Sequence, residues 1–310
     1  MIEMIDLTKQ YRDLIAVDHL TMTIAQGDCF GFIGPNGAGK TTTIQMLSTL
    51  LQPTSGSIKI GGCDIIRDPA GAKTLIGYMP DYFGLYDEMK VQEYLEFFCR
   101  CYGLKGQAAH DTVNDVLALT DLEVKRDAHV KALSRGMQQR LCLAKTLLHN
   151  PPVLLLDEPA SGLDPRARIE FRELMKELRA MGKTIFISSH ILSELGDFCT
   201  SVGIMEKGRL LISGPIHEIA DRLRTTRLIK LKLLKEEDAP KAEQFLRTYP
   251  TIQSVSRRDG MMELEHTGSL EDLVELIQAI VHERIPFIGL HEEIRHLEDI
   301  FLKVTKGEVS

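Results

Sequence analysis

Short apolar runs and longer helical patterns alternate over the first two thirds of the chain. The runs at 29–33, 153–156 and 185–187 contain only apolar residues and glycine, as is typical of strands buried on both faces of a parallel sheet. Around 44–51 and 91–102, apolar residues instead recur every three or four positions, which predicts amphipathic helices. This alternation predicts an α/β fold, and we expect the first third of the chain to form one mixed sheet.

Two changes of pattern divide the chain. Residues 82–150 carry mainly helical patterns, so we expect a helical insertion there. Near residue 225 the pattern changes to short strands and helices, with strands at 228–234, 252–257, 261–265 and 285–290, helices at 240–248 and from 270, and a hairpin turn at Asp259-Gly260. The order β-α-β-β-α-β resembles a small ferredoxin-like α+β module. We therefore expect one domain at 1–224 and an accessory domain at 225–310.

The composition of the chain argues against several classes of protein. The chain has 310 residues, is 44% hydrophobic and carries a net charge of −7, which argues against a nucleic-acid-binding protein with a basic surface. No apolar run approaches the ~20 residues that span a bilayer, and the N-terminus lacks the features of a signal peptide. The cysteines, including the close pair Cys99 and Cys101, form no zinc set and are expected to be reduced thiols. We expect a soluble chain that reaches a membrane only through a partner.

Residues 34–42 carry the clearest chemical signal. Gly34 to Thr41 fits G-x-x-x-x-G-K-[ST], a loop whose backbone N–H groups surround phosphates. Glycines at the close-approach positions keep the loop open, Lys40 adds its charge at a helix N-terminus, and the Thr41 hydroxyl lies where Mg²⁺ would bind. The alternative is a glycine-rich turn without a ligand, but the strand before and the helix after favour a phosphate site. Its residues are Gly34, Pro35, Asn36, Gly37, Ala38, Gly39, Lys40, Thr41 and Thr42.

Polar residues follow the other predicted strands. Asp157 and Glu158 end the run at 153–156, where parallel sheets place ligands, so Asp157 can hold Mg²⁺ and Glu158 can activate a water. His190 follows the strand near 184–187 and is expected to contact the γ-phosphate, although alone it would be an ordinary structural histidine. Ser134 is the expected N-cap of a helix that runs to about residue 149, and on that stretch alone an ordinary capped helix is an equally good interpretation.

The combined order of these motifs resembles the nucleotide-binding subunit of an ABC transporter over about residues 1–220. Residues 34–41 match the Walker A motif, 133–138 the signature, 153–158 Walker B, 161–164 the D-loop and His190 the switch histidine. The resemblance implies that Tyr11 stacks on adenine, that Ser134 and Gly136 contact the γ-phosphate, and that Glu158, His190 and Lys40 are catalytic. The segment 297–302 is similar to the ending of exporter-type subunits, a less specific signal.

Three residues depart from the family pattern. Arg135 and Met137 replace a glycine and a glutamine of the signature, and Asp81 replaces a glutamine. Met137 cannot close a capping box on Ser134, whereas Arg135 places a cation near the expected anion and so compensates. We expect Asp81 to join Thr41 and Asp157 near Mg²⁺.

The resemblance implies an ATPase motor that works as a head-to-tail dimer, a homodimer or a pair of ABC subunits, with Mg-ATP between the Walker A loop of one subunit and the signature of the other. An integral membrane permease subunit would dock on the aromatic segment 82–86, unless these aromatic residues pack inward on the insertion. The chain would then lie in the cytoplasm, at the inner face of the membrane, and act in export. The alternatives are a soluble ABC ATPase that acts on DNA or ribosomes, and a regulatory subunit that binds nucleotide without turnover.

Overall fold

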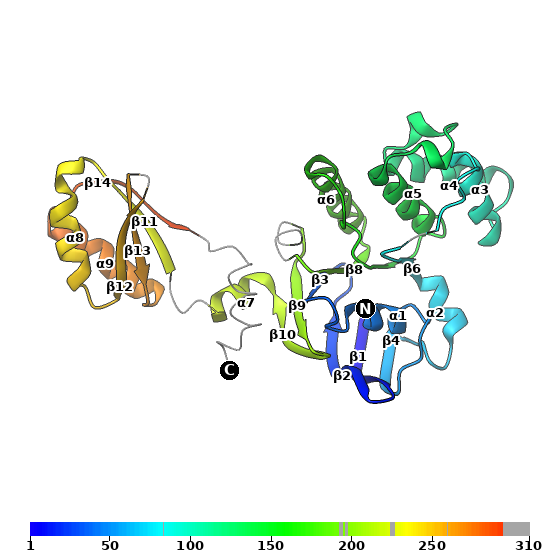
Figure 1. Cartoon of the computed structure of the whole chain (residues 1–310), viewed down its shortest axis with the longest axis horizontal. Helices are drawn as coiled ribbons and strands as arrows, with labels where there is room; N and C mark the ends of the chain where they lie inside the picture. The colour runs from blue at the N-terminus through cyan, green and yellow to red at the C-terminus, as the bar shows by residue number, and fades with distance from the viewer. Residues whose placement is uncertain (83, 192–194, 196–197, 224–226, 259, 294–310) are drawn as a thin grey trace. The chain divides into compact units, whose positions relative to one another are not determined.

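The computed structural model describes residues 1–310 except 83, 192–194, 196–197, 224–226, 259 and 294–310. The aromatic Phe83, the turn residue Asp259 and the segment 297–302 therefore lie outside the described residues. The chain forms two compact units, residues 1–216 and 217–310, which are described separately (Figure 1).

An antiparallel sheet opens the first unit. Its strands are β1 (Ile2–Tyr11), β2 (Leu14–Ile24), β4 (Ser55–Ile60) and β5 (Cys63–Asp64), in the order β2-β1-β4-β5. These strands alternate buried and exposed residues, so one face packs on the core. The expectation of one mixed sheet in the first third is wrong, because β3 and β6 belong to a second sheet. Alternation distinguishes the one-sided strands from the fully apolar ones.

The second sheet positions the functional residues. It contains β3 (Cys29–Ile33), β6 (Ile76–Met79), β7 (Val153–Leu156), β8 (Thr184–Ser189), β9 (Ser201–Glu206) and β10 (Arg209–Pro215), in the order β10-β9-β3-β8-β7-β6. All neighbours are parallel except β10, which pairs with β9 as an antiparallel hairpin. Every residue of β3, β7 and β8 is buried, as their sequences predict. The carboxyl ends of β3, β7 and β8 consequently meet at one edge.

Helices complete the first unit. They are α1 (Lys40–Leu47), α2 (Pro69–Leu75), α3 (Val91–Cys101), α4 (Gly106–Leu119), α5 (Arg135–Leu147) and α6 (Pro165–Ala180), with short 3-10 turns η1 (Glu123–Lys125) and η2 (Val130–Ala132). Helices α3, α4 and α5 pack on one another in the expected helical insertion. Ser134 caps α5 by accepting a hydrogen bond from the Met137 N–H at 3.4 Å, as predicted. Among the described residues, no helix is both long and apolar enough to cross a bilayer.

The second unit begins at His217, within helix α7 (Ile216–Leu223). It also contains a four-stranded sheet. The sheet and its helices follow the order β11 (Arg227–Leu233), α8 (Ala239–Thr248), β12 (Ile252–Arg258), β13 (Met261–His266), α9 (Leu270–His282) and β14 (Phe287–Glu293). The strand order is β12-β13-β11-β14 with every neighbour antiparallel. Its core includes Leu231 and Leu264 from the sheet and Leu246 and Leu276 from the helices. This is the predicted β-α-β-β-α-β arrangement.

Candidate active site

The phosphate loop joins the end of β3 to the start of α1, as its sequence predicts. A side chain at Gly39, whose φ is 107°, would place its Cβ only 2.4 Å from the Ala16 carbonyl oxygen. At Gly34 the same atom would lie 2.3 Å from the Met205 carbonyl oxygen. These two glycines thus let the loop pack against β2 and β9, and only Gly37, where an added Cβ would meet no atom within 4 Å, faces open space. That all three glycines also leave room for a ligand stays a prediction.

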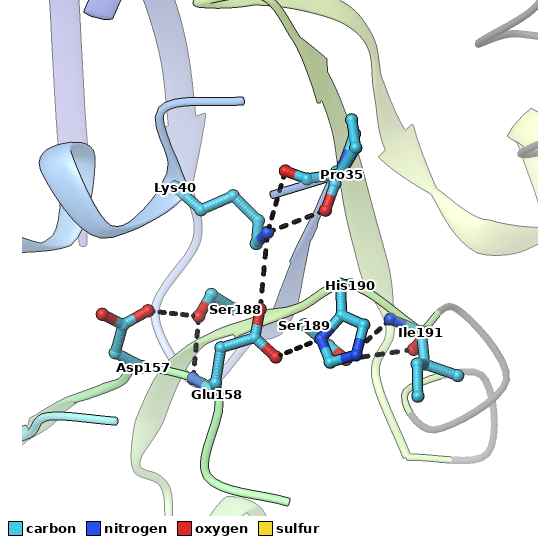
Figure 2. A network of polar contacts seen from close by, with 9 residues as sticks. Pro35, Lys40, Asp157, Glu158, Ser188, Ser189, His190 and Ile191 are labelled. Carbon is cyan, nitrogen blue, oxygen red and sulfur yellow. Dashed lines mark hydrogen bonds and ion pairs between the residues drawn. The ribbon is translucent and has the colours of Figure 1, made fainter. Parts of the chain in front are cut away.

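Lys40 lies at the centre of the site and is only 6% exposed. Its Nζ donates hydrogen bonds to the carbonyl oxygens of Gly34 (2.7 Å) and Pro35 (3.3 Å). The same atom lies 3.4 Å from Oε1 of Glu158 (Figure 2). An ammonium group has three N–H donors, and the two loop carbonyls use two of them, while Glu158 adds an ion pair. The loop therefore orients the lysine, and the lysine connects the loop to Glu158.

Glu158 connects two of the predicted catalytic residues. While Oε1 faces Lys40, Oε2 lies 2.7 Å from Nδ1 of His190, just beyond the end of β8 (Figure 2). The Glu158 side chain is 14% exposed and that of His190 is 42% exposed. His190 is thus not an isolated structural histidine, because the structure brings it into direct contact with the carboxylate at the end of β7.

Asp157 is almost fully buried beside Glu158. Its backbone N–H donates to the Met79 carbonyl oxygen of β6 at 2.9 Å, and its Oδ1 accepts a hydrogen bond from the Ser188 hydroxyl at 2.6 Å. Burial raises the pKa of the Asp157 carboxyl, hydrogen bonds from Ser188 and Thr41 lower it, and the charges of Glu158 and Asp81 raise it. A cation beside Asp157 would therefore favour its ionised form.

A cavity of about 630 Å³ collects most of the predicted residues. It is lined by Tyr11, Leu14, Ile15, Ala16, Asn36, Gly37, Ala38, Gly39, Lys40, Thr41, Thr42, Asp81, Glu158, Ser161, His190 and Lys207. Gly34 and Pro35 contribute through the carbonyl oxygens that hold Lys40, and Asp157 lies behind Glu158.

Five lining residues were not among the site residues predicted from the sequence: Leu14, Ile15, Ala16, Lys207 and Ser161, which was noted only as part of the 161–164 motif. Leu14 and Ile15 are exposed apolar residues next to Tyr11, on a strand that otherwise exposes polar positions, but this exposure is visible only in the structure. The sequence carries no signal for Lys207, because this residue reaches the cavity through a tertiary contact: the Gly208 N–H donates to the Ala38 carbonyl oxygen at 3.0 Å.

Ser134 and Gly136 do not join this cavity. They line a separate one of about 410 Å³, together with residues of the turn before α6 such as Gly162 and Asp164. The Arg135 guanidinium lies against that turn, because a Cβ added to Gly162 would be 2.6 Å from its Cζ. A single chain therefore holds the phosphate loop and the signature residues at two separate places.

The aromatic segment that begins at Tyr82 has two kinds of residue. Tyr82 is 89% exposed. The ring of Tyr86 contacts those of Tyr94, Phe97 and Phe98, with centroids 5.8 to 6.3 Å apart, although the residue is 51% exposed. Tyr86 thus packs on α3, while Tyr82 points away from the described core.

A phosphate loop at the end of β3, a carboxylate pair at the end of β7 and a histidine at the end of β8 define a P-loop nucleoside triphosphatase. A family model described as ABC transporter matches residues 17–161. The Nod factor export ATP-binding protein I of Burkholderia lata is 39% identical over 216 residues, which are 70% of this chain and 71% of that protein. The protein of the same name from Cupriavidus metallidurans is 32% identical and covers 100% of this chain and 98% of its own length.

A solved structure of the ATP-binding subunit of an ABC transporter gives a TM-score of 0.65 at 31% identity, covering 72% of this chain and 92% of that one. The chain belongs to the family of ABC transporter ATP-binding subunits. It binds ATP and is an ATPase whose hydrolysis drives transport. The alternatives of a soluble non-transport ATPase and of a purely regulatory subunit are not favoured.

Proposed function

We propose that Glu158 is the general base of ATP hydrolysis, that Lys40 and the loop amides bind the phosphates, and that His190 orients the attacking water and the γ-phosphate. The contact of one carboxylate with both Lys40 and His190 supports this proposal most directly. Because two of the three donors of Lys40 are held by loop carbonyls, a bound phosphate would take the donor that faces Glu158. Oε1 of Glu158 would then be free to accept a proton from water, while His190 keeps Oε2 in place.

Tyr11 would stack on adenine, with Leu14 and Ile15 beside it at the same end of the cavity. Thr41 and Asp157 would hold Mg²⁺, which neutralises phosphate charge when bound, and Asp81 would act nearby. The donors fit this ion, because Asp157 keeps free acceptor positions beyond its bond from Ser188 and the Thr41 hydroxyl is adjacent. Among the described residues, no three His, Cys, Asp or Glu side chains form a metal cage. That suits Mg²⁺, which takes most of its ligands from phosphate and water.

The complete site would form between two copies of the cassette. Ser134 and Gly136 lie in a cavity apart from the phosphate loop, so each chain carries two halves of different sites. A head-to-tail dimer, either of this chain or with a paired ABC subunit, would join the loop of one chain to the signature of the other. Arg135 would then approach the same phosphate from the partner side.

The motor would act on an integral membrane permease through the insertion that carries Tyr82, with the chain in the cytoplasm at the inner face of the membrane. No nucleic acid takes part. The similarity to proteins named for Nod factor export supports export as the direction. We assign nucleotide hydrolysis to residues 1–224 and an accessory role to residues 225–310.

A complementation experiment tests the shared site. Lys40→Ala removes phosphate binding on one chain, and Ser134→Glu places a negative charge on the signature side. Each variant alone should lose ATPase activity, whereas a mixture should recover activity through dimers in which an intact loop meets an intact signature. Lys176→Ala, which removes an exposed lysine of α6, is the control for loss of a positive charge. Inactive mixtures of two well-folded variants that still dimerise would contradict the composite site.

A further inference from the structure

Ser188 is a buried residue of β8 with no assigned part in the reaction. It is fully buried, and its hydroxyl group contacts both carboxylate residues at the end of β7. The hydroxyl donates to Oδ1 of Asp157 at 2.6 Å and accepts from the backbone N–H of Glu158 at 2.9 Å (Figure 2). A hydroxyl has one hydrogen to donate and lone pairs to accept, so this pair of bonds uses it in both senses.

The hydrogen bond from the Glu158 N–H to Ser188 matters because of the backbone conformation of Glu158. Its φ is 48°, in the left-handed region that residues other than glycine seldom occupy and that persists only where the surroundings hold it. The turn is held on its other side by a hydrogen bond from the Ser161 N–H to the Glu158 carbonyl oxygen at 3.0 Å. The bond from the Glu158 N–H to Ser188 is therefore the point at which β8 fixes this unusual conformation.

The backbone N–H groups of the two carboxylate residues are held by different neighbouring strands. Asp157 donates its backbone N–H to Met79 of β6, and Glu158 is tied to β8 by a side chain. Ser188 also lies two residues before His190, and alternate residues of an extended chain point to the same side. One strand end thus sets the position of Glu158 and of the histidine that contacts it.

We propose that Ser188 is a positioning residue for ATP hydrolysis, whose hydroxyl holds the Glu158 backbone in its left-handed turn and fixes the Asp157 carboxylate beside the phosphate loop. This inference rests on the proposed roles of Glu158 and Asp157. The hydroxyl does not touch the cavity, so it acts through those two residues. Its loss should impair the hydrolytic step more than nucleotide binding.

Three substitutions separate hydrogen bonding from packing. Ser188→Ala removes the hydroxyl, Ser188→Cys keeps a similar size with a weak donor, and Ser188→Thr keeps the hydroxyl with an added methyl group. Ser48→Ala removes another buried hydroxyl, at the end of α1, where it donates to the Gln45 carbonyl oxygen, and serves as the matched control. Thermal unfolding of all four variants shows whether each is folded.

At saturating Mg-ATP, kcat of Ser188→Ala should fall by about ten- to a hundredfold, the factor expected when a hydrogen bond to a charged group is lost. Binding of a fluorescent ATP analogue in the presence of EDTA should change by less than about threefold, since the loop is untouched. The gain in affinity on adding Mg²⁺, measured without turnover, should shrink, because Asp157 is no longer fixed. Ser188→Cys should resemble Ser188→Ala, and Ser188→Thr should recover much of the activity.

Three outcomes of these measurements would contradict either the role of Ser188 or the roles on which it rests. If the unmodified chain hydrolyses ATP but Ser188→Ala matches Ser48→Ala in kcat and in the Mg²⁺ effect, the positioning role is wrong. Equal activity of Ser188→Cys and the unmodified chain would show that only size matters, which also overturns the inference. A folded, unmodified chain that does not hydrolyse ATP in its complex would instead count against the proposed roles of Glu158 and Asp157.

Discussion

The contact between Lys40 and Glu158 leads to a prediction about nucleotide affinity. Their charged atoms lie 3.4 Å apart, and the side chains are 6% and 14% exposed, so solvent screens the pair little. At an effective dielectric constant of about 20, the gross attraction is on the order of 5 kcal/mol. Most of it is offset by the cost of removing both charges from water. In Glu158→Gln, phosphate no longer competes with a carboxylate for Lys40 and no longer approaches a negative charge.

If about one fifth of the gross term remains, Glu158→Gln should bind ATP about fivefold more tightly, since 1.4 kcal/mol is a factor of ten. The rate of hydrolysis should change in the opposite direction and decrease. An amide has nearly the shape of the carboxylate but cannot take the proton from water, and general-base catalysis contributes about 10²- to 10⁴-fold. The variant should therefore combine tighter binding with a loss of turnover of about a hundredfold or more.

The assay measures the two effects separately. Titration with a fluorescent ATP analogue gives affinity, and single-turnover release of phosphate gives the hydrolysis rate. Sizing the variant with and without Mg-ATP should show a dimer only with nucleotide. Glu173→Gln, which neutralises an exposed carboxylate of α6, is the matched control. Unchanged or weaker binding would refute the competition for Lys40, and hydrolysis within a few-fold of the parent would refute the general base. A monomer under both conditions would count against the shared site.

Three further predictions concern other parts of the chain. Asp81→Ala should leave ATP affinity nearly intact but lower the turnover of the reconstituted complex by roughly tenfold, as loss of a positioning group does. Asp81→Gln should retain much of the turnover. If Asp81→Ala turns over like the unmodified chain, Asp81 is only a turn residue. Tyr82→Ser should weaken co-purification with the permease, unlike Val124→Ser at another exposed apolar residue, 88% accessible. Burial lowers the pKa of His266 from 6.5, and neither ring nitrogen has a partner among the described residues. As the pH falls below 6.5, the unfolded chain therefore takes up this proton first and stability drops, until the pH reaches the lower folded pKa. Titration of the ring resonance by NMR, with denaturation at several pH values, checks this, and His266→Leu should flatten the dependence.

The sequence by itself determined the features whose chemistry is local. A phosphate loop needs contiguous residues, so 34–41 could be identified without a fold, and the strand before it and helix after it followed from their apolar patterns. Ser134 was predictable as an N-cap because a cap depends on residues within one turn. The order of strands and helices in the second unit followed from its hydrophobic patterns, and the Asp259-Gly260 turn signal predicted the pairing of β12 with β13.

Only the tertiary structure decided how distant segments meet. It separated the strands of the first third into two sheets, since pairing depends on which faces can be buried together and not on proximity in the chain. It showed that Gly34 and Gly39 serve the packing of the loop against β9 and β2. It also brought Ser188 to both carboxylate residues that follow β7. A serine in an apolar strand has no sequence signal for such a role, because the partners that satisfy its hydroxyl come from another strand.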